Sequence, residues 1–248
     1  VGVYASLNVK VIKHYDLTND INANNIPDEF EENESGSFML KDNMIIDSTY
    51  ESLNLSNLDI NIDDGKTLII ENGNIKMESI IIGSEDTSTL LINENGLLEV
   101  DLLVLSESKG DQAELVVNHE SSQLIVNEDS TIGADGSGNL TVENGIVLFE
   151  QSVTLGDELY ASGVLEVNND STVFIKEDLT MNGLGDSSVE CNSGIVSVGN
   201  SLMVSGESST FNIDGCDVSI KDIIVDDDSV FTFSNGDLRF ETYTGTLT

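Results

Sequence analysis

The sequence of 248 residues has very few basic side chains. Lys and Arg total 9 against 46 Asp and Glu, so the formal net charge is −37 at pH 7. A chain of this charge repels nucleic acids and anionic membrane surfaces. The partners that its charge admits are cations, including Ca²⁺, and basic surfaces.

Other residue types that mark particular protein classes are also scarce. The chain has no Trp, one Pro and two Cys, and none of its apolar runs approaches the length of a membrane-spanning helix. Membrane insertion is therefore not expected. Cys191 and Cys216 are separated by about one repeat of the pattern described below, so a disulfide between neighbouring repeats is geometrically possible. Two cysteines do not identify a compartment, but the composition is more typical of an extracellular surface protein than of a cytosolic enzyme.

What the chain does have is a repeat. Short apolar pairs recur in threes, joined by corners rich in Asn, Asp and Gly, which tolerate left-handed backbone conformations. One complete copy is Phe211–Ser229. Side-chain amides in stacked corners can also share hydrogen bonds. Aligning the first apolar pair of each copy gives starting positions at Phe38, Leu68, Leu90, Leu115, Leu140, Leu165, Val189, Phe211 and Phe231.

This repeat predicts the fold class. A strand of three or four residues cannot bury a face alone, whereas stacked coils pair every strand in parallel with its copies above and below. A period of about 20 to 25 residues with three strands is typical of a right-handed parallel β-helix. We therefore expect an all-β protein, a single solenoid of eight or nine coils over residues 38–248, and a rod roughly 40 Å long.

The first 15 residues do not follow the repeat. They alternate strictly between apolar and other residues, which predicts a single long strand with one apolar side, detached from the solenoid. This segment carries Lys10 and Lys13 and no acid, so its charge is +2 while the remaining 233 residues carry −39. Residues 16–37 hold the only Pro and many acids, which is typical of a linker. The apolar side of the strand comprises Val1, Val3, Ala5, Leu7, Val9 and Val11.

The last coil stays apolar to its end, without a polar element to cover it. An uncovered edge of this kind is a template for another strand. The predicted acceptor edge comprises Phe231, Phe233, Leu238, Phe240 and Tyr243. The N-terminal strand either adds to this edge on a neighbouring copy, which we favour, or caps its own solenoid.

The sequence has no pattern that predicts catalysis. The two histidines, His14 and His119, have no partners at metal-ligand spacing, and no nucleophile elbow is present. Polysaccharide lyases need clustered cations, which the chain lacks, and a hydrolase acid pair cannot be chosen among 46 acids. We expect a protein that is not an enzyme and that needs no cofactor.

Calcium is the one ligand with a compositional argument. Acids gather at corners, such as Asp63 with Asp64 and Glu85 with Asp86, where stacked coils bring oxygen ligands together. No EF-hand loop or glycine-rich nonapeptide is present, so solvated corners are the alternative. The candidate Ca²⁺ ligands are Asp226, Asp227 and Asp228, and the sequons that permit glycosylation are Asn33, Asn54, Asn139 and Asn169.

The repeat as it stands in Gly138–Asp157, GNLTVENGIVLFEQSVTLGD, resembles the β-helical passengers of bacterial autotransporter adhesins. The N-terminal segment is similar to the donor strand of chaperone–usher pilins. These resemblances imply a cell-surface location and an adhesive or structural role. We therefore expect a subunit of an extracellular filament or surface array that polymerises head to tail with itself through its N-terminal strand. The alternatives are a glycan-binding or glycan-cleaving β-helix and a Ca²⁺-dependent adhesin.

Overall fold

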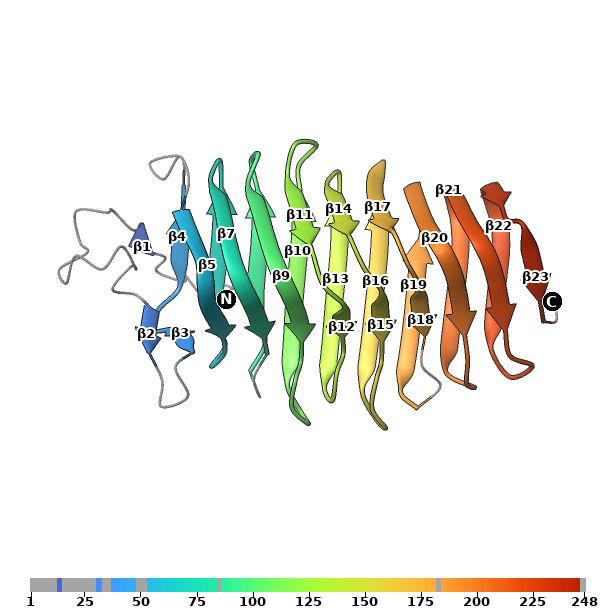
Figure 1. The fold of residues 1–248 in the computed structure, drawn as a ribbon, viewed down its shortest axis with the longest axis horizontal. Helices are drawn as coiled ribbons and strands as arrows, with labels where there is room; N and C mark the ends of the chain where they lie inside the picture. The colour runs from blue at the N-terminus through green and yellow to red at the C-terminus, as the bar shows by residue number, and fades with distance from the viewer. Residues whose placement is uncertain are drawn as a thin grey trace, which may run out of the picture.

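A computed structural model of the chain describes residues 13–14, 30–32, 37–47, 53–83, 86–181 and 184–245. These residues form a parallel β-solenoid of about nine turns, without a helix among them. Figure 1 shows the coils stacked side by side along one axis, with the N-terminal strands at one end and β23 at the other. The predicted all-β solenoid is confirmed.

The rod has three faces, and a complete coil contributes one strand segment to each of them. Face 1 begins with a two-residue strand and ends with the last long strand. Its members are β1 (Lys13–His14), β4 (Met44–Ile46), β6 (Thr67–Glu71), β8 (Ser88–Asn93), β10 (Gln112–Asn118), β13 (Ser137–Glu143), β16 (Ser162–Asn168), β19 (Asp186–Cys191), the start of β21 (Ser209–Val225) and the start of β22 (Val230–Arg239).

Faces 2 and 3 share several strands that bend around a corner without a break. Face 2 comprises the first parts of β5 (Leu53–Ile62), β7 (Asn74–Ile82), β9 (Leu97–Leu105) and β20 (Gly194–Val204), the strands β11 (Gln123–Val126), β14 (Ile146–Phe149) and β17 (Ser171–Ile175), the middle of β21 and the end of β22. Face 3 comprises β3 (Phe38–Leu40), β12 (Ser130–Ile132), β15 (Val153–Leu155), β18 (Leu179–Met181), β23 (Thr242–Thr244) and the last parts of β5, β7, β9, β20 and β21. The strand β2 (Phe30–Glu32) lies antiparallel to β3.

The core is the interior of the rod, and it is built from columns of identical positions. On face 1, Leu90 pairs with Leu115, Leu115 with Leu140, and Leu140 with Leu165, and all four are fully buried. Burying one such side chain contributes about 2 kcal/mol. The column continues in register through Val189 to Phe211 and Phe231. The predicted repeat starts from Leu68 onward are therefore confirmed to the residue.

The first predicted start, Phe38, is wrong. Phe38 lies on face 3, where it pairs with Ile60, and the face 1 partner of Leu68 is Met44. The segment before β4 has an apolar pair of its own, and this pair was mistaken for the first pair of a repeat. With Met44 as the start, the first interval falls within the period of the other coils.

The corners use the residue chemistry that the repeat suggested. Asn72, Asn95 and Asn169 have φ values of 53°, 70° and 53°, a region in which Asn is one of the few tolerated side chains. Asn95 Nδ2 donates to the side-chain Oδ1 of Asn72 in the adjacent coil at 2.9 Å, and Asn192 Nδ2 donates to Asn168 Oδ1 at the same distance. These bonds hold the corners of neighbouring coils in register.

Candidate functional site

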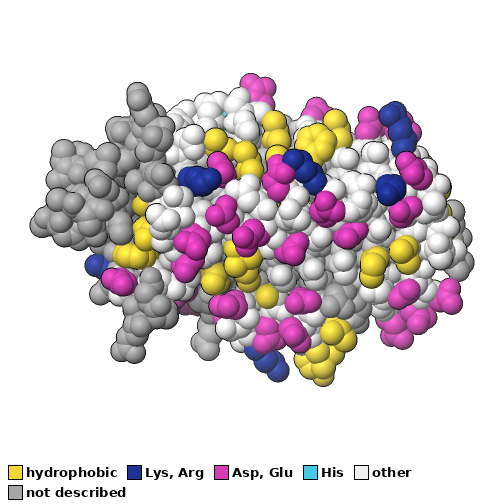
Figure 2. Space-filling view, in the orientation of Figure 1, with side chains coloured by type: hydrophobic (Ala, Val, Ile, Leu, Met, Phe, Trp, Pro, Cys, Tyr) yellow, Lys and Arg dark blue, Asp and Glu magenta, His cyan; other side chains and the backbone are white. Residues whose placement is uncertain are grey.

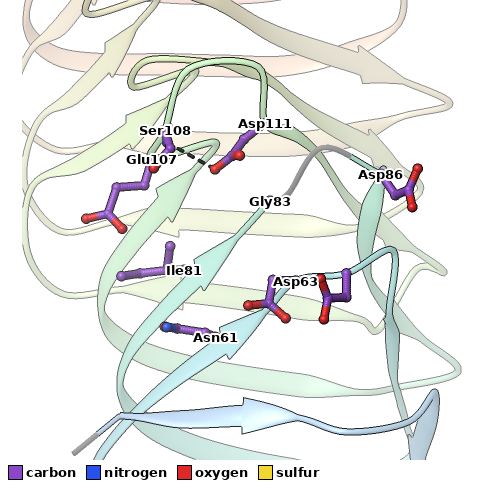
Figure 3. Close-up of a pocket in the computed structure, with 9 residues that line it drawn as sticks. Asn61, Asp63, Ile81, Gly83, Asp86, Glu107, Ser108 and Asp111 are labelled. Carbon is purple, nitrogen blue, oxygen red and sulfur yellow. Dashed lines mark hydrogen bonds between the residues drawn. The ribbon is translucent and has the colours of Figure 1, made fainter. Parts of the chain in front are cut away.

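An acidic hollow of about 460 Å³ lies beside face 3 in the N-terminal half of the rod. Three consecutive coils contribute to it, through the ends of β5 and β7, the start of the segment leading into β8, and the loop between β9 and β10 (Figure 3). Its walls therefore hold five carboxylates from three separate corners. The lining residues are Asn61, Asp63, Asp64, Ile81, Gly83, Asp86, Glu107, Ser108 and Asp111.

Close packing between loops gives the hollow its shape. The Ser108 backbone N–H donates to Asp111 Oδ2 at 3.0 Å, which fixes one carboxylate at the rim. Gly83 has a φ of 140°, and a Cβ at this position would lie 3.3 Å from Cβ of Asp111 and 3.0 Å from Cα of Ser106. Glycine is thus required here both by the backbone conformation and by the space between the coils.

Two oxygen atoms in the wall lack a hydrogen-bond partner among the described residues. Asn61 Oδ1 and Asp63 Oδ1 are both buried and unpartnered. Burial raises the pKa of the Asp63 carboxyl, the negative charges of Asp64 and Asp111 raise it further, and Lys66 opposes them. Full ionisation of the carboxyl groups that line the hollow is therefore unfavourable.

These oxygen atoms are of the kind that Ca²⁺ prefers, but their arrangement does not form a metal centre. Among the residues that the structure describes, no group of three or more His, Cys, Asp or Glu side chains is placed to hold a metal ion. The candidate ligands Asp226, Asp227 and Asp228 lie exposed in the turn after β21. The sequence had placed Asp63, Asp64 and Asp86 at stacked corners; it missed Glu107 and Asp111, whose spacing from the earlier corner acids follows the coil period.

Neutralising Asp63 is expected to stabilise the protein at neutral pH. A raised pKa in the folded state means that the free energy of unfolding falls as pH rises from about 4, the usual range of an aspartate, through the folded-state value. Asp63→Asn should therefore melt at a higher temperature than the parent at pH 7, and this gain should vanish below pH 4. Thermal unfolding between pH 3 and 7 measures the difference.

The matched control is Glu120→Gln, which removes one exposed corner charge far from the hollow along the sequence. It should gain less than Asp63→Asn at pH 7, because it relieves only the general repulsion of the chain. Equal gains for the two variants at every pH would contradict a local effect in the hollow.

The N-terminal end of the rod is covered by strands from the predicted leader. Lys13 and His14 of β1 pair in parallel with Met44 and Ile45 of β4. In the predicted linker, β2 pairs with β3 in the register of Phe30 with Leu40. These two strands lie against the first coil of their own chain. The predicted strand residues Val1, Val3, Ala5, Leu7, Val9 and Val11 lie outside the described residues and stay a prediction.

At the other end, the predicted edge residues divide into buried and exposed groups. Phe231 is only 2% exposed, and its ring stacks on Phe211 with centroids 5.4 Å apart. Phe233 and Phe240 are 47% and 46% exposed. Leu238 and Tyr243 are half-buried against the core. Burial raises the pKa of Tyr243, whose hydroxyl has no hydrogen-bond partner among the described residues. The exposed aromatic surface of this coil is therefore Phe233 and Phe240.

Cys191 and Cys216 form a disulfide with their Cα atoms 5.8 Å apart. Both side chains are fully buried inside the rod. Cys191 ends β19, whereas Cys216 lies in β21 of the next coil, so the bond joins two neighbouring coils across a corner. The pairing that the sequence left open is thus present.

The four sequons have different settings. Asn169 is exposed at a corner between β16 and β17, whereas Asn139 is half-buried on β13, where its Oδ1 accepts a hydrogen bond from Thr141 at 3.5 Å. Asn33 and the side chain of Asn54 lie outside the described residues. Of the two sequon side chains described, only Asn169 leaves room for a glycan without disturbing a strand.

Comparison of the chain with protein-family models, with curated proteins and with solved structures finds no match. Within the described ranges, no helix is long and apolar enough to cross a membrane.

Proposed function

We propose that this protein is a structural subunit of an extracellular filament, in which the N-terminal strand of one copy adds to the C-terminal coil of the next. The observation that supports this proposal most is the condition of face 1 at its two ends. Among the described strands, β1 pairs only with β4, and β22 pairs only with β21. Within the described part of the chain, each end of the same parallel face therefore has one strand edge without a partner strand, the arrangement that strand addition requires.

The position of β1 allows the N-terminal strand to pair with its own solenoid and with a second copy at the same time. One edge of β1 already pairs with β4 of its own chain. The opposite edge faces away from the solenoid, where the β22 edge of a second copy would continue the parallel face. Such a contact joins two different surfaces and does not close, so it propagates into a linear polymer.

Charge and apolar surface support the same arrangement. The N-terminal 15 residues carry +2 and the remaining chain −39, so the strand is attracted to any neighbouring body. Phe233 and Phe240 give the C-terminal coil an exposed apolar surface for the apolar side of the strand. The Cys191–Cys216 disulfide supports an oxidising, extracellular location.

Blocking the C-terminal edge tests the proposal. Phe233→Lys with Phe240→Lys should raise the concentration needed for polymerisation roughly 100-fold, because two exposed aromatic contacts of about 1.5 kcal/mol each are lost and edge lysines oppose strand addition. Sedimentation velocity and light scattering measure the polymer fraction.

The control variant is Met203→Lys with Ile224→Lys, which adds the same charge at side chains of similar exposure on face 3. This control should polymerise like the parent. Unchanged polymerisation of the edge variant, or loss of polymerisation in the control alone, would refute the role of this edge.

A further inference from the structure

Face 2 presents apolar side chains to solvent over several consecutive coils. Its outward side chains form two rows that run along the rod, one residue per coil in each row. The first row comprises Asn74, Leu97, Gln123, Ile146, Thr172, Ile195, Asp217 and Asp237, and the second Lys76, Glu99, Ile125, Leu148, Phe174, Ser197, Ser219 and Arg239.

The middle of these rows is apolar over five consecutive coils. Ile146, Phe174 and Ile195 are 36%, 41% and 44% exposed, and Leu97, Ile125 and Leu148 lie half-buried between them. In the shared orientation of Figures 1 and 2, hydrophobic side chains are visible near the upper edge of the molecule, where β11, β14 and β17 lie. A contiguous apolar strip of this kind on a soluble surface marks an interaction site.

Two basic side chains, Lys76 and Arg239, lie on face 2, and both pair with acids of the same face. Lys76 Nζ lies 2.6 Å from Glu99 Oε1. Arg239 Nη2 lies 2.5 Å from Asp237 Oδ2, and Lys176, directly after β17, pairs with Glu150. The face 1 strands carry several acids and, from β4 onward, no Lys or Arg: Glu71, Glu114, Glu143, Glu166, Asp186 and Glu190. Face 2 is thus close to neutral in a strongly acidic protein.

We infer that face 2 is a lateral docking surface for a second copy of this chain, with the two rods parallel and related by a two-fold axis along the rod. Two rods of charge −37 repel each other, and a near-neutral apolar face allows the closest approach at the lowest electrostatic cost. A two-fold axis makes the contact self-complementary, as in most homodimers.

The charges select this orientation over the alternative. With the axis along the rod, each coil meets its own copy and the first row faces the second row. Arg239 then faces Asp237 of the second copy, and Ile146 faces Leu148. With the axis along the strands, the coil order reverses and Arg239 meets Lys76 of the second copy, which is unfavourable. Charge complementarity therefore favours parallel rods in register.

The size of the face indicates how strong this contact is. Eight coils spaced by about 4.8 Å, with strands about 15 Å long, give face 2 an area of about 600 Å² per chain. A stable interface buries about 800 Å² per partner, so the dimer is weak in isolation. The net charge of the two chains opposes association, so raising the salt concentration from 0.05 to 0.5 M should strengthen the dimer. An interface held together by attraction between charged surfaces would instead be weakened by salt.

Sedimentation velocity of the full-length chain carrying Phe233→Lys and Phe240→Lys, in which head-to-tail growth is blocked, tests this inference. At 0.5 M NaCl, Phe174→Thr with Ile195→Thr should weaken dimerisation at least tenfold. Met203→Thr with Ile224→Thr, of similar exposure on face 3, should leave the dimer unchanged. Threonine keeps the preference for a strand at all four positions.

A charge exchange tests the axis. Arg239→Asp should weaken the dimer, and the exchange of both residues, Asp237→Arg with Arg239→Asp, should restore it, because the two-fold axis pairs these positions across the interface. Three results would each overturn the inference. The chain could form no dimer at millimolar concentration in 0.5 M NaCl, or the face 2 and face 3 variants could weaken dimerisation equally. The third is that the charge exchange does not restore association. None of these outcomes depends on whether head-to-tail filaments form.

Discussion

Removal of residues 1–15 is expected to leave a folded, β-rich rod that no longer polymerises. The deletion takes away the alternating apolar strand and both of its lysines, together with the β1 edge that would meet β22 of a neighbour. The solenoid keeps its core, because the buried columns begin at Leu40 and Met44. Far-UV circular dichroism reports the fold, and sedimentation reports the loss of polymer.

A pair of substitutions separates the apolar side of the strand from its other side. Val3→Ser with Leu7→Ser should reduce polymerisation nearly as much as the deletion, because the alternating pattern of the sequence assigns both residues to the apolar side of the predicted strand. Tyr4→Ser with Asn8→Ser changes the opposite side and should have little effect. If the truncated chain forms filaments at the parent's concentration, the strand is not the connecting element.

Loss of the Cys191–Cys216 disulfide is expected to lower the free energy of unfolding by about 3.5 kcal/mol. The bond closes a loop of 25 residues, and the chain-entropy estimate for a loop of this length gives that magnitude. The suitable variant is Cys191→Val with Cys216→Ala. Valine matches Val167, which pairs with Cys191, and alanine suits a column in which Cys216 pairs with Gly194 and Gly236.

Urea denaturation measures this change, and the parent protein refolded under reducing conditions serves as the control. Because both sulfur atoms are fully buried, reduction requires unfolding, so the control must be reduced in denaturant first. The reduced parent and the double variant should have similar midpoints, both well below that of the oxidised parent. A loss under 1 kcal/mol would mean that the cross-link does little for the rod.

The coil register was predictable because several local signals agree at every repeat. Alternation fixed which side chains point inward, and Asn and Gly marked the corners, so Leu115, Leu140 and Leu165 were aligned correctly. Where the signals were weaker, the alignment failed. Phe38 begins an apolar pair that belongs to face 3, and β2 lies in a stretch whose acids and proline indicated a linker.

The surface features needed the register before they became visible. The hollow joins Asp63 with Asp111, and face 2 joins Ile146 with Phe174, through residues more than 20 positions apart in the sequence. Corner lengths vary between coils, so the row of an outward side chain is not fixed by the period alone. Once the strand pairs are known, the neighbours of each outward residue follow directly.

Cryo-electron microscopy of the full-length protein at high concentration tests the central claim most directly. The proposal predicts linear filaments in which each solenoid follows the next along a common axis, with density for residues 1–11 of one copy beside β22 of its neighbour. A field of separate rods, with the N-terminal segment folded only onto its own first coil, would contradict it.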